Sequence, residues 1–207
     1  MAKVTRSGRR QALSAERITT LAFALVDAEG PAALSMRRLA TELGCQAMSL
    51  YHHVENLDAL LDRLVDELLS RCHPPASGAP VDRDSLLKMA RDFLRLALDH
   101  PRVFQMVVAR PWVGQQALTL AMSLVAQFRQ LGLEPRPALA AARVLGAYLN
   151  GAGTALAGWK LQRTAPPRTL VDAAPEVVWL QQQSQAAAVR ADIDSGLELL
   201  VDALLPG

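Results

Sequence analysis

Apolar residues recur along the chain at intervals of three and four, the spacing of one face of an α-helix. The first such segment follows Ser14, has apolar residues at positions 18, 21, 22, 25 and 26, and stops at Gly30-Pro31. Serine is a favoured helix N-cap, and glycine followed by proline ends a helix. We find no alternation of apolar and polar residues of the kind that indicates a strand. The pattern therefore predicts an all-α chain.

Two short helices and a longer one are predicted next. The first spans 35–43, with Ser35 as its N-cap and Gly44 at its end, because glycine readily adopts the left-handed conformation that closes a helix. The second spans 46–53 and is only about two turns long. A longer apolar-periodic helix begins after Asn56. Two short helices joined across a glycine are typical of a helix-turn-helix, whose second helix enters the DNA major groove.

The rest of the chain predicts a larger helical body. A linker rich in proline and small residues, 73–81, separates it from the N-terminal module. Further helices are expected at about 82–98, 101–109, 114–131, 137–162, 175–189 and 191–205, with breaks at 133–137 and 164–169. We accordingly divide the chain into a basic arm (1–13), a helix-turn-helix domain (14–56), a connecting helix (57–72) and a body (73–207).

Composition and charge narrow the class of protein. The chain has 207 residues, 51% of them hydrophobic and 20% charged, which is typical of a folded protein. It has no apolar run long enough for a membrane span, no secretory signal, and two cysteines, so we expect a soluble cytoplasmic protein. Residues 1–53 hold seven Lys and Arg against four acidic residues, whereas the remainder is nearly neutral. A basic first quarter suits contact with a polyanion.

The outward side of the second short helix offers hydrogen-bonding and small apolar groups without a carboxylate that would repel phosphate. Its residues are Gln46, Ala47, Met48, Ser49, Tyr51, His52 and His53, while Leu50 and Val54 face inward. An exposed aromatic such as Tyr51 is expected to touch DNA. His53 is either a backbone contact or a satisfied polar group at the helix end. Arg37 and the helix N-terminus capped by Ser35 are suited to phosphate oxygens.

These segments resemble a known family. The run LAFALVDAEGPAALSMRRLATELGCQAMSLYHHVENLDALLDRLVDELL is similar to the DNA-binding domain of the TetR family of bacterial transcriptional regulators, over roughly residues 14–72. The diagnostic points are Ala-Glu-Gly after the first helix, Leu-Ala-x-x-Leu-Gly in the second, and Ser-Leu-Tyr-x-His before an Asn-x-x-x-Leu-Leu helix. The segments ALDHPRVFQMVVARP and GLELLVDAL are similar to the tetracycline-repressor branch in particular.

The resemblance assigns DNA contacts to nine positions: Ser35, Met36, Arg37, Ala47, Met48, Ser49, Tyr51, His52 and His53. Two positions depart from the family pattern. Leu57 replaces a lysine that usually grips phosphate at the start of the fourth helix, so we expect the backbone grip to depend more on the basic arm. Unchanged affinity and salt dependence after deletion of residues 1–10 would contradict this expectation. Met48 replaces a threonine or proline, so the operator sequence does not follow by analogy.

For the body, the resemblance implies a homodimer formed by the last long helices and a pocket for a small molecule. The apolar stripe from Ile193 to Leu204 and the glycines at 146, 151 and 153 suit a subunit contact. Candidate pocket residues are His73, Phe93, Phe104, Met106, Trp112, Gln116, Asn150, Thr154 and Trp179. Gln105 and Met106 stand where the tetracycline repressors have a metal-binding histidine. We therefore expect a mostly apolar effector and no metal or other cofactor.

The resemblance thus implies a homodimeric, ligand-responsive transcriptional regulator, most simply a repressor released from a palindromic operator when the effector binds. Three alternatives compete with it. A metal site would need ligand spacings that Cys45, His52, His53, Cys72 and His73 do not provide. A catalytic site lacks a nucleophile–base motif, so we expect no enzyme. A helical protein that binds small molecules or partners without DNA activity is the remaining alternative, against which the exposed Tyr51 and the basic arm argue.

Overall fold

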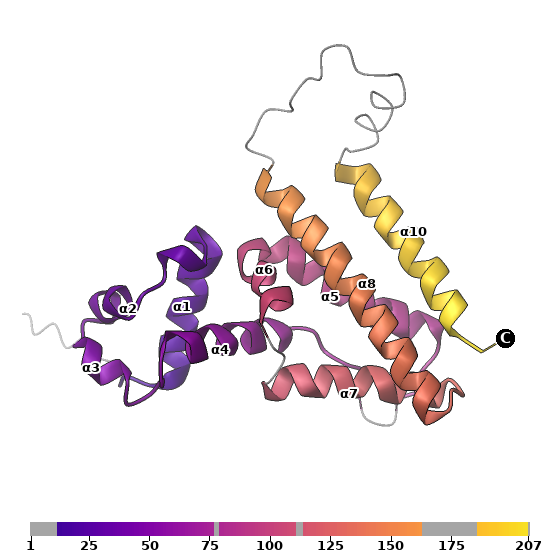
Figure 1. Cartoon of the computed structure of the whole chain (residues 1–207), viewed down its shortest axis with the longest axis horizontal. Helices are drawn as coiled ribbons and strands as arrows, with labels where there is room; N and C mark the ends of the chain where they lie inside the picture. Colours follow the sequence, from indigo (N-terminus) through magenta and orange to yellow (C-terminus); the bar gives the residue numbers. More distant parts are fainter. Residues whose placement is uncertain (1–11, 77–78, 111–113, 163–185, 207) are drawn as a thin grey trace, which may run out of the picture.

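The computed structural model describes residues 12–76, 79–110, 114–162 and 186–206, and every regular element within these ranges is a helix (Figure 1). The elements are α1 (Ala15–Glu29), η1 (Pro31–Ala33), α2 (Met36–Leu43), α3 (Ala47–Leu50), α4 (Leu57–Leu69), α5 (Arg83–Asp99), α6 (Pro101–Ala109), α7 (Gln115–Gln130), α8 (Pro135–Gln162) and α10 (Ala186–Leu204). Helices α1–α3 group at one end, and α4 runs from this head into the body formed by α5–α8 and α10. The expected all-α fold is confirmed.

The helix boundaries of the head follow from local capping. The side chains of Ser14, Ser35 and Asn56 accept hydrogen bonds from backbone amides of the first turns of α1, α2 and α4. Gly30 and Gly44 end α1 and α2 with φ of 93° and 65°, a region that disfavours side chains. These starts and stops confirm the sequence-based boundaries. The second short helix is the exception, because regular α-helix covers only Ala47–Leu50 and the next three residues form a turn.

One apolar core joins the head to α4. Ile18 of α1, Leu39 of α2, Leu50 of α3 and Leu64 of α4 are fully buried in it. Burial of such side chains contributes roughly 1.5–3 kcal/mol each. Because α3 is too short to be stable alone, its orientation depends on Leu50 and on Val54, which is 1% exposed. The head thus holds a very short helix at a fixed angle.

The body is built around α8, against which α5, α6, α7 and α10 all pack. Gly153 permits the contact with α6, since a Cβ there would lie 2.3 Å from Cζ of the buried Phe104. The assignment of Gly153 to a subunit contact is therefore wrong, because its close neighbour lies in the same chain. An added Cβ at Gly146 or Gly151 would meet nothing within 4 Å.

The C-terminal helix differs from its prediction in two ways. It begins at Ala186 and continues through residue 190, where the sequence predicted a break between two helices, because its alanines favour a helix. Residues 175–185 of the first predicted helix and the break at 164–169 lie outside the described residues. Its apolar stripe is also not left for a partner, because α5 and α8 bury Leu197 and Val201 completely. The outward face instead carries Leu199, which is 72% exposed.

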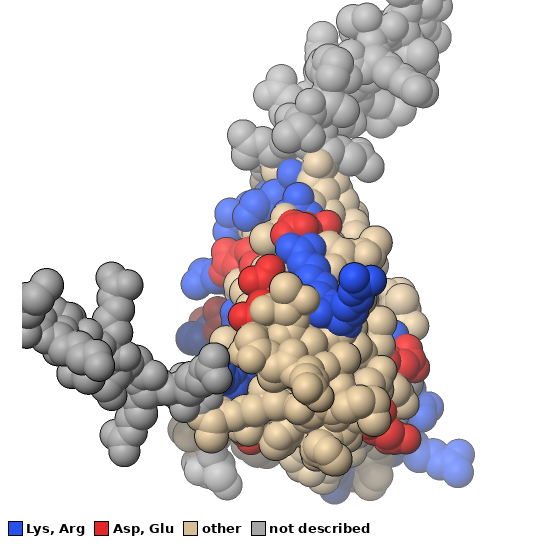
Figure 2. All heavy atoms as spheres, turned by 90° about the vertical axis from the view of Figure 1, so that its left-hand side faces the viewer, with Lys and Arg blue, Asp and Glu red and all other residues tan. Residues whose placement is uncertain are grey.

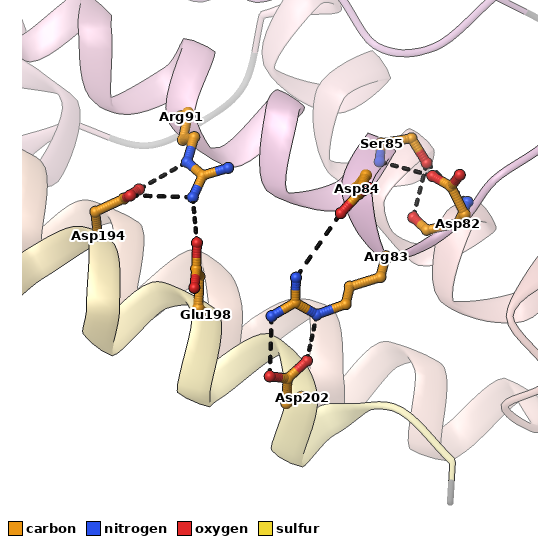
Figure 3. Close-up of polar contacts among 8 residues, drawn as sticks. All are labelled: Asp82, Arg83, Asp84, Ser85, Arg91, Asp194, Glu198 and Asp202. Atoms are coloured by element: carbon orange, nitrogen blue, oxygen red, sulfur yellow. Dashed lines mark hydrogen bonds and ion pairs between the residues drawn. The ribbon is translucent and has the colours of Figure 1, made fainter.

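Ion pairs fix α10 along α5 (Figure 3). Arg91 donates to Asp194 at 2.7 and 3.0 Å and to Glu198 at 2.6 Å, and Arg83 pairs with Asp202. The hydrogen bonds from Arg91 lower the pKa of Asp194, and the contact with Arg83 lowers that of Asp202. Charge pairs thus supplement the apolar contacts on the solvent side of α10. Within the described ranges, no helix is long and apolar enough to cross a membrane.

Candidate DNA-reading surface and ligand cavity

The reading surface is the outward side of α3 and the turn that follows it. Met48 is 70% and Tyr51 45% exposed, and His52 is exposed beside them. Ala47, Ser49 and His53 are half-buried. Seen from the end of the molecule that carries this surface, a broad lower area shows no charged side chain, with Lys, Arg, Asp and Glu above it and at its edges (Figure 2). An uncharged, hydrogen-bonding surface of this kind suits contact with base edges.

The start of α2 provides the neighbouring polar groups. Ser35 is exposed, and its hydroxyl accepts from the amide of Arg38 at 3.2 Å. The side chain of Met36 is 9% exposed and packs in the core, so only its backbone remains for a contact with DNA. Arg37 is exposed and has no side-chain partner among the described residues, which leaves it available to a phosphate.

Arg38 is not equivalent to its neighbour. Its guanidinium donates to both carboxylate oxygens of Glu29 at 2.8 and 2.6 Å, and these hydrogen bonds lower the pKa of Glu29. This pair ties α2 to the end of α1. At the start of α4, Leu57 is half-buried against the core and offers no charge. Of these positions, Arg37 is therefore the cation that remains for the DNA backbone.

The body holds a partly open cavity of about 560 Å³ between α5, α6, α7 and α8. Its walls are mostly aliphatic, and the small side chains of α8 leave the space open. The lining consists of Cys72, Met89, Phe93, Val107, Val108, Arg110, Leu120, Ala121, Leu124, Val125, Leu139, Ala142, Arg143, Gly146, Ala147, Leu149 and Asn150. A mostly apolar cavity of this size with a few polar groups is typical of a small-molecule site.

Two of the candidate ligand residues, Phe93 and Asn150, line this cavity. Five others do not, although each is described. Phe104 and Met106 are buried in the core, and His73, Gln116 and Thr154 are exposed. Phe104 instead packs edge-on against Phe93, with ring centroids 5.4 Å apart. The remaining two candidates, Trp112 and Trp179, lie outside the described residues.

The sequence analysis missed Arg110, Arg143 and Cys72. Arg110 follows α6, and only the fold shows that the end of this helix meets α4. One side of α8 carries Arg143, Gly146 and Ala147. Their spacing of three and four residues indicated a shared helix face, but the small residues had suggested a subunit contact. Cys72 is 3% exposed, and burial raises the pKa of its thiol to about 12. It therefore acts as an apolar wall rather than as a reactive group.

Arg110 connects the cavity to the head. Its Nε donates to Asp62 at 2.6 Å, and its Nη2 donates to the backbone carbonyl of Asp58 at 2.8 Å and contacts the carboxylate of that residue at the same distance. Burial by itself lowers the pKa of Arg110, but the hydrogen bonds to Asp58 and Asp62 outweigh it and raise the pKa overall. One turn further along α4, Asp66 accepts from the amide of Ala117 at 2.9 Å. Three carboxylates spaced by four residues thus tie one face of α4 to α6 and α7.

A second polar joint lies where α1 and the end of α4 meet the corner between α5 and α6. His100 contacts Asp27 through Nδ1 at 2.8 Å and Arg71 through Nε2 at 2.6 Å. Because a guanidinium only donates, Nε2 must accept and Nδ1–H must donate to Asp27. The guanidinium of Arg71 also stacks on Phe23, 4.1 Å from the ring centroid. The body therefore has one polar contact with α4 through Arg110, and another with α1 and Arg71 through His100.

These features define a class of protein: a helix-turn-helix head joined by one connecting helix to a helical body that holds an apolar cavity. The family described as "Tetracyclin repressor-like, C-terminal domain" matches residues 75–204, and the head carries the helix-turn-helix. The chain belongs to the TetR family.

Curated relatives carry names of transcriptional regulators. One from Saccharopolyspora erythraea is 31% identical over 157 residues, 76% of this chain and 66% of the relative. The transcriptional repressor DrrR1 of Streptomyces coeruleorubidus is 34% identical over 146 residues, 70% of this chain and 54% of the relative. The chain therefore aligns with less than two thirds of the length of each. The solved structure of the TetR-family protein ActR of Streptomyces coelicolor with actinorhodin is 26% identical, with a TM-score of 0.73 over 94% of this chain and 97% of that one.

Proposed function

We propose that the protein is a homodimeric transcriptional regulator that binds a palindromic operator and leaves it when a small, mostly apolar molecule fills the cavity. Its place of action is the cytoplasm, and it needs no metal or organic cofactor. The observation that carries this proposal is a continuous series of contacts from the reading surface to the cavity. The reading surface ends at His53, three residues before the N-cap of α4, and α4 is bonded through Asp58 and Asp62 to Arg110, which lines the cavity.

The proposed mechanism is a shift between two positions of α4. Operator DNA favours the position in which the two reading heads of a dimer lie about 34 Å apart, one turn of the double helix. An occupied cavity favours another position of α6 and α7. The contacts of α4 with Arg110 and with the amide of Ala117 transmit this displacement to α4. A ligand that binds one position more tightly lowers the affinity for the operator, and operator DNA lowers the affinity for the ligand by the same factor. ActR, solved with actinorhodin, is a family precedent for a bound small molecule.

The proposed dimer uses the outward faces of α8 and α10. Val144 is 47% and Leu199 72% exposed there, and Gly151 and Ser195 allow close helix contact. Exposed leucine and valine beside small residues on adjacent helices are typical of a helical subunit interface. A dimer would also carry two reading surfaces related by a two-fold axis, as a palindrome requires.

A gel shift on the DNA upstream of the protein's own gene tests this proposal. Tyr51→Ala and Met48→Ala should each weaken operator binding by roughly 5- to 150-fold, the loss expected for about 1–3 kcal/mol of base contact. Met122→Ala is the matched control, because Met122 is 72% exposed on α7, against 70% for Met48 on the reading surface. It should leave binding unchanged.

Equal effects of Met48→Ala and Met122→Ala would contradict the reading surface. Absence of any sequence-preferring complex would favour the alternative of a helical small-molecule-binding protein without DNA activity.

A further inference from the structure

The charged side chains in the cavity lining are both positive. Two guanidinium groups, those of Arg110 and Arg143, belong to its lining, and no Asp or Glu does. Arg143 is exposed and has no hydrogen-bond or ion-pair partner among the described residues, and most of the other lining side chains are aliphatic. A guanidinium in the wall of an apolar cavity can form a charge-assisted, bidentate pair with an anion, although water screens part of the attraction at an exposed arginine. The charge of Arg143 is thus left for a group that the described residues do not supply.

The second guanidinium is satisfied by the connecting helix α4 rather than by the body. Arg110 uses Nε and Nη2 for Asp62 and Asp58 of α4, while Nη1 has no partner within the described ranges. The side chain of Asp58 is 80% exposed, so water competes with its ion pair, whereas that of Asp62 is 28% exposed. An anion in the cavity therefore competes with two carboxylates, one of them weakly held.

We infer that the effector is an amphipathic anion, with an apolar body and a carboxylate, sulfonate or phosphate group, and that this group pairs with Arg143 and draws Arg110 away from Asp58 and Asp62. This inference rests on the proposed function, in which the cavity is the effector site. It adds the chemical class of the effector and identifies Arg110 as the residue through which its charge acts. A neutral molecule of the same shape fills the cavity without breaking the Arg110–α4 contacts.

The apolar part of the ligand and its polar contacts are also specified. Phe93, Leu124 and Leu149 present ring and aliphatic surface to a flat or branched hydrocarbon body. Asn150 is the neutral polar amide of the lining, and its Oδ1 is buried without a partner. A hydroxyl on the ligand beside Asn150 would give this oxygen a donor after a small side-chain rotation.

Two fluorescent probes of nearly equal shape test the charge requirement. 8-Anilinonaphthalene-1-sulfonate is anionic, and N-phenyl-1-naphthylamine is its neutral counterpart; both brighten in apolar sites. The full chain should bind one sulfonate probe per subunit. Arg143→Gln should weaken sulfonate binding at least tenfold and leave the neutral probe unaffected. Arg136→Gln is the matched control, because Arg136 is an exposed arginine on α8 outside the cavity.

A further variant tests the competition at Arg110. Asp62→Asn removes one of the two carboxylates that hold Arg110, so it should tighten sulfonate binding severalfold without changing the neutral probe. Arg143→Lys keeps the charge and should retain most of the sulfonate affinity, which separates lost charge from lost folding. Absence of saturable sulfonate binding, or equal effects of Arg143→Gln on both probes, would overturn the inference.

The operator assay distinguishes failure of the anion site from failure of the proposed DNA-binding function. If the protein binds its operator, the sulfonate probe should weaken binding by at least fivefold and the neutral probe should not. Equal release by both probes would leave the proposed regulator intact and refute the role of charge. Failure to bind DNA without any probe would refute the proposed function, while the probe affinities would still report on the anion site.

Discussion

Gly153 illustrates how a single residue sets the packing of the body. The space that its missing side chain leaves is filled by the ring of Phe104, which is completely buried and contacts Phe93 at its edge. Phe93 in turn lines the cavity. The glycine therefore positions one wall of the ligand site through two aromatic rings, although it is not itself part of that wall.

Gly153→Ala should destabilise the protein by about 1–3 kcal/mol, the usual cost of overpacking a filled core. The added Cβ would lie 2.3 Å from a ring that has no room to move. Gly158→Ala is the control, because nothing lies within 4 Å of its added Cβ and alanine favours a helix by up to about 1 kcal/mol. Urea unfolding measures both. Equal stability of the two variants would contradict this packing.

Residue-level prediction from the sequence succeeded where one face of one helix decides the outcome. Leu50 and Val54 face inward and Tyr51 and His52 face outward, as the helical period requires. It failed for the cavity, because aromatic and methionine side chains fill cores as readily as they line pockets. Which of them meets the cavity depends on how four helices cross, and this crossing has no local signature in the sequence.

At the scale of elements, α10 is held by charges as well as by its buried stripe. Arg91 and Arg83 of α5 contact Asp194, Glu198 and Asp202 along its length (Figure 3). The folded protein lowers the pKa values of Asp194 and Asp202, so both bind protons less readily than in the unfolded chain. Their contribution to stability is complete above the ordinary aspartate range and disappears as the pH falls through the lowered values.

Asp194→Asn should therefore reduce the free energy of unfolding by about 0.5–1 kcal/mol at pH 7, a magnitude limited by the solvent exposure of the pair. The difference from the wild type should be smaller at pH 3 and should disappear only as the pH falls further, through the lowered pKa of Asp194. Asp192→Asn is the control on the same helix, because Asp192 is exposed and has no ion-pair partner among the described residues. Urea unfolding at both pH values gives the comparison. A pH-independent loss for Asp194→Asn would argue against the ion pair.

Helix boundaries were the most predictable elements, because capping residues mark them locally. Ser14, Ser35, Asn56, Gly30 and Gly44 each stand where the sequence placed them. The length of α3 was overestimated, since the turn after Leu50 continues the outward pattern of a helix. The tie between Arg110 and the carboxylates of α4 was not predictable, because these residues are about fifty positions apart.

For the molecule as a whole, two long-range properties follow from the resemblance rather than from local pattern. The dimer and the use of the basic arm on DNA stay predictions, and the arm lies largely outside the described residues. The structure adds a physical route between the two ends. The body contacts α4 through Arg110, and it contacts α1 and Arg71 through His100. Movement of α6 relative to α4 must alter one or both joints.

The central claim is that this chain reads a specific DNA sequence. The most direct test measures fluorescence anisotropy for a duplex selected by the protein from a randomised pool and for a scrambled duplex of equal composition, at about 150 mM salt. We predict an affinity for the selected duplex that is higher by about a thousandfold or more, the range of specific regulators. Equal affinities for the two duplexes would show that only charge attracts the protein to DNA, and would contradict the account.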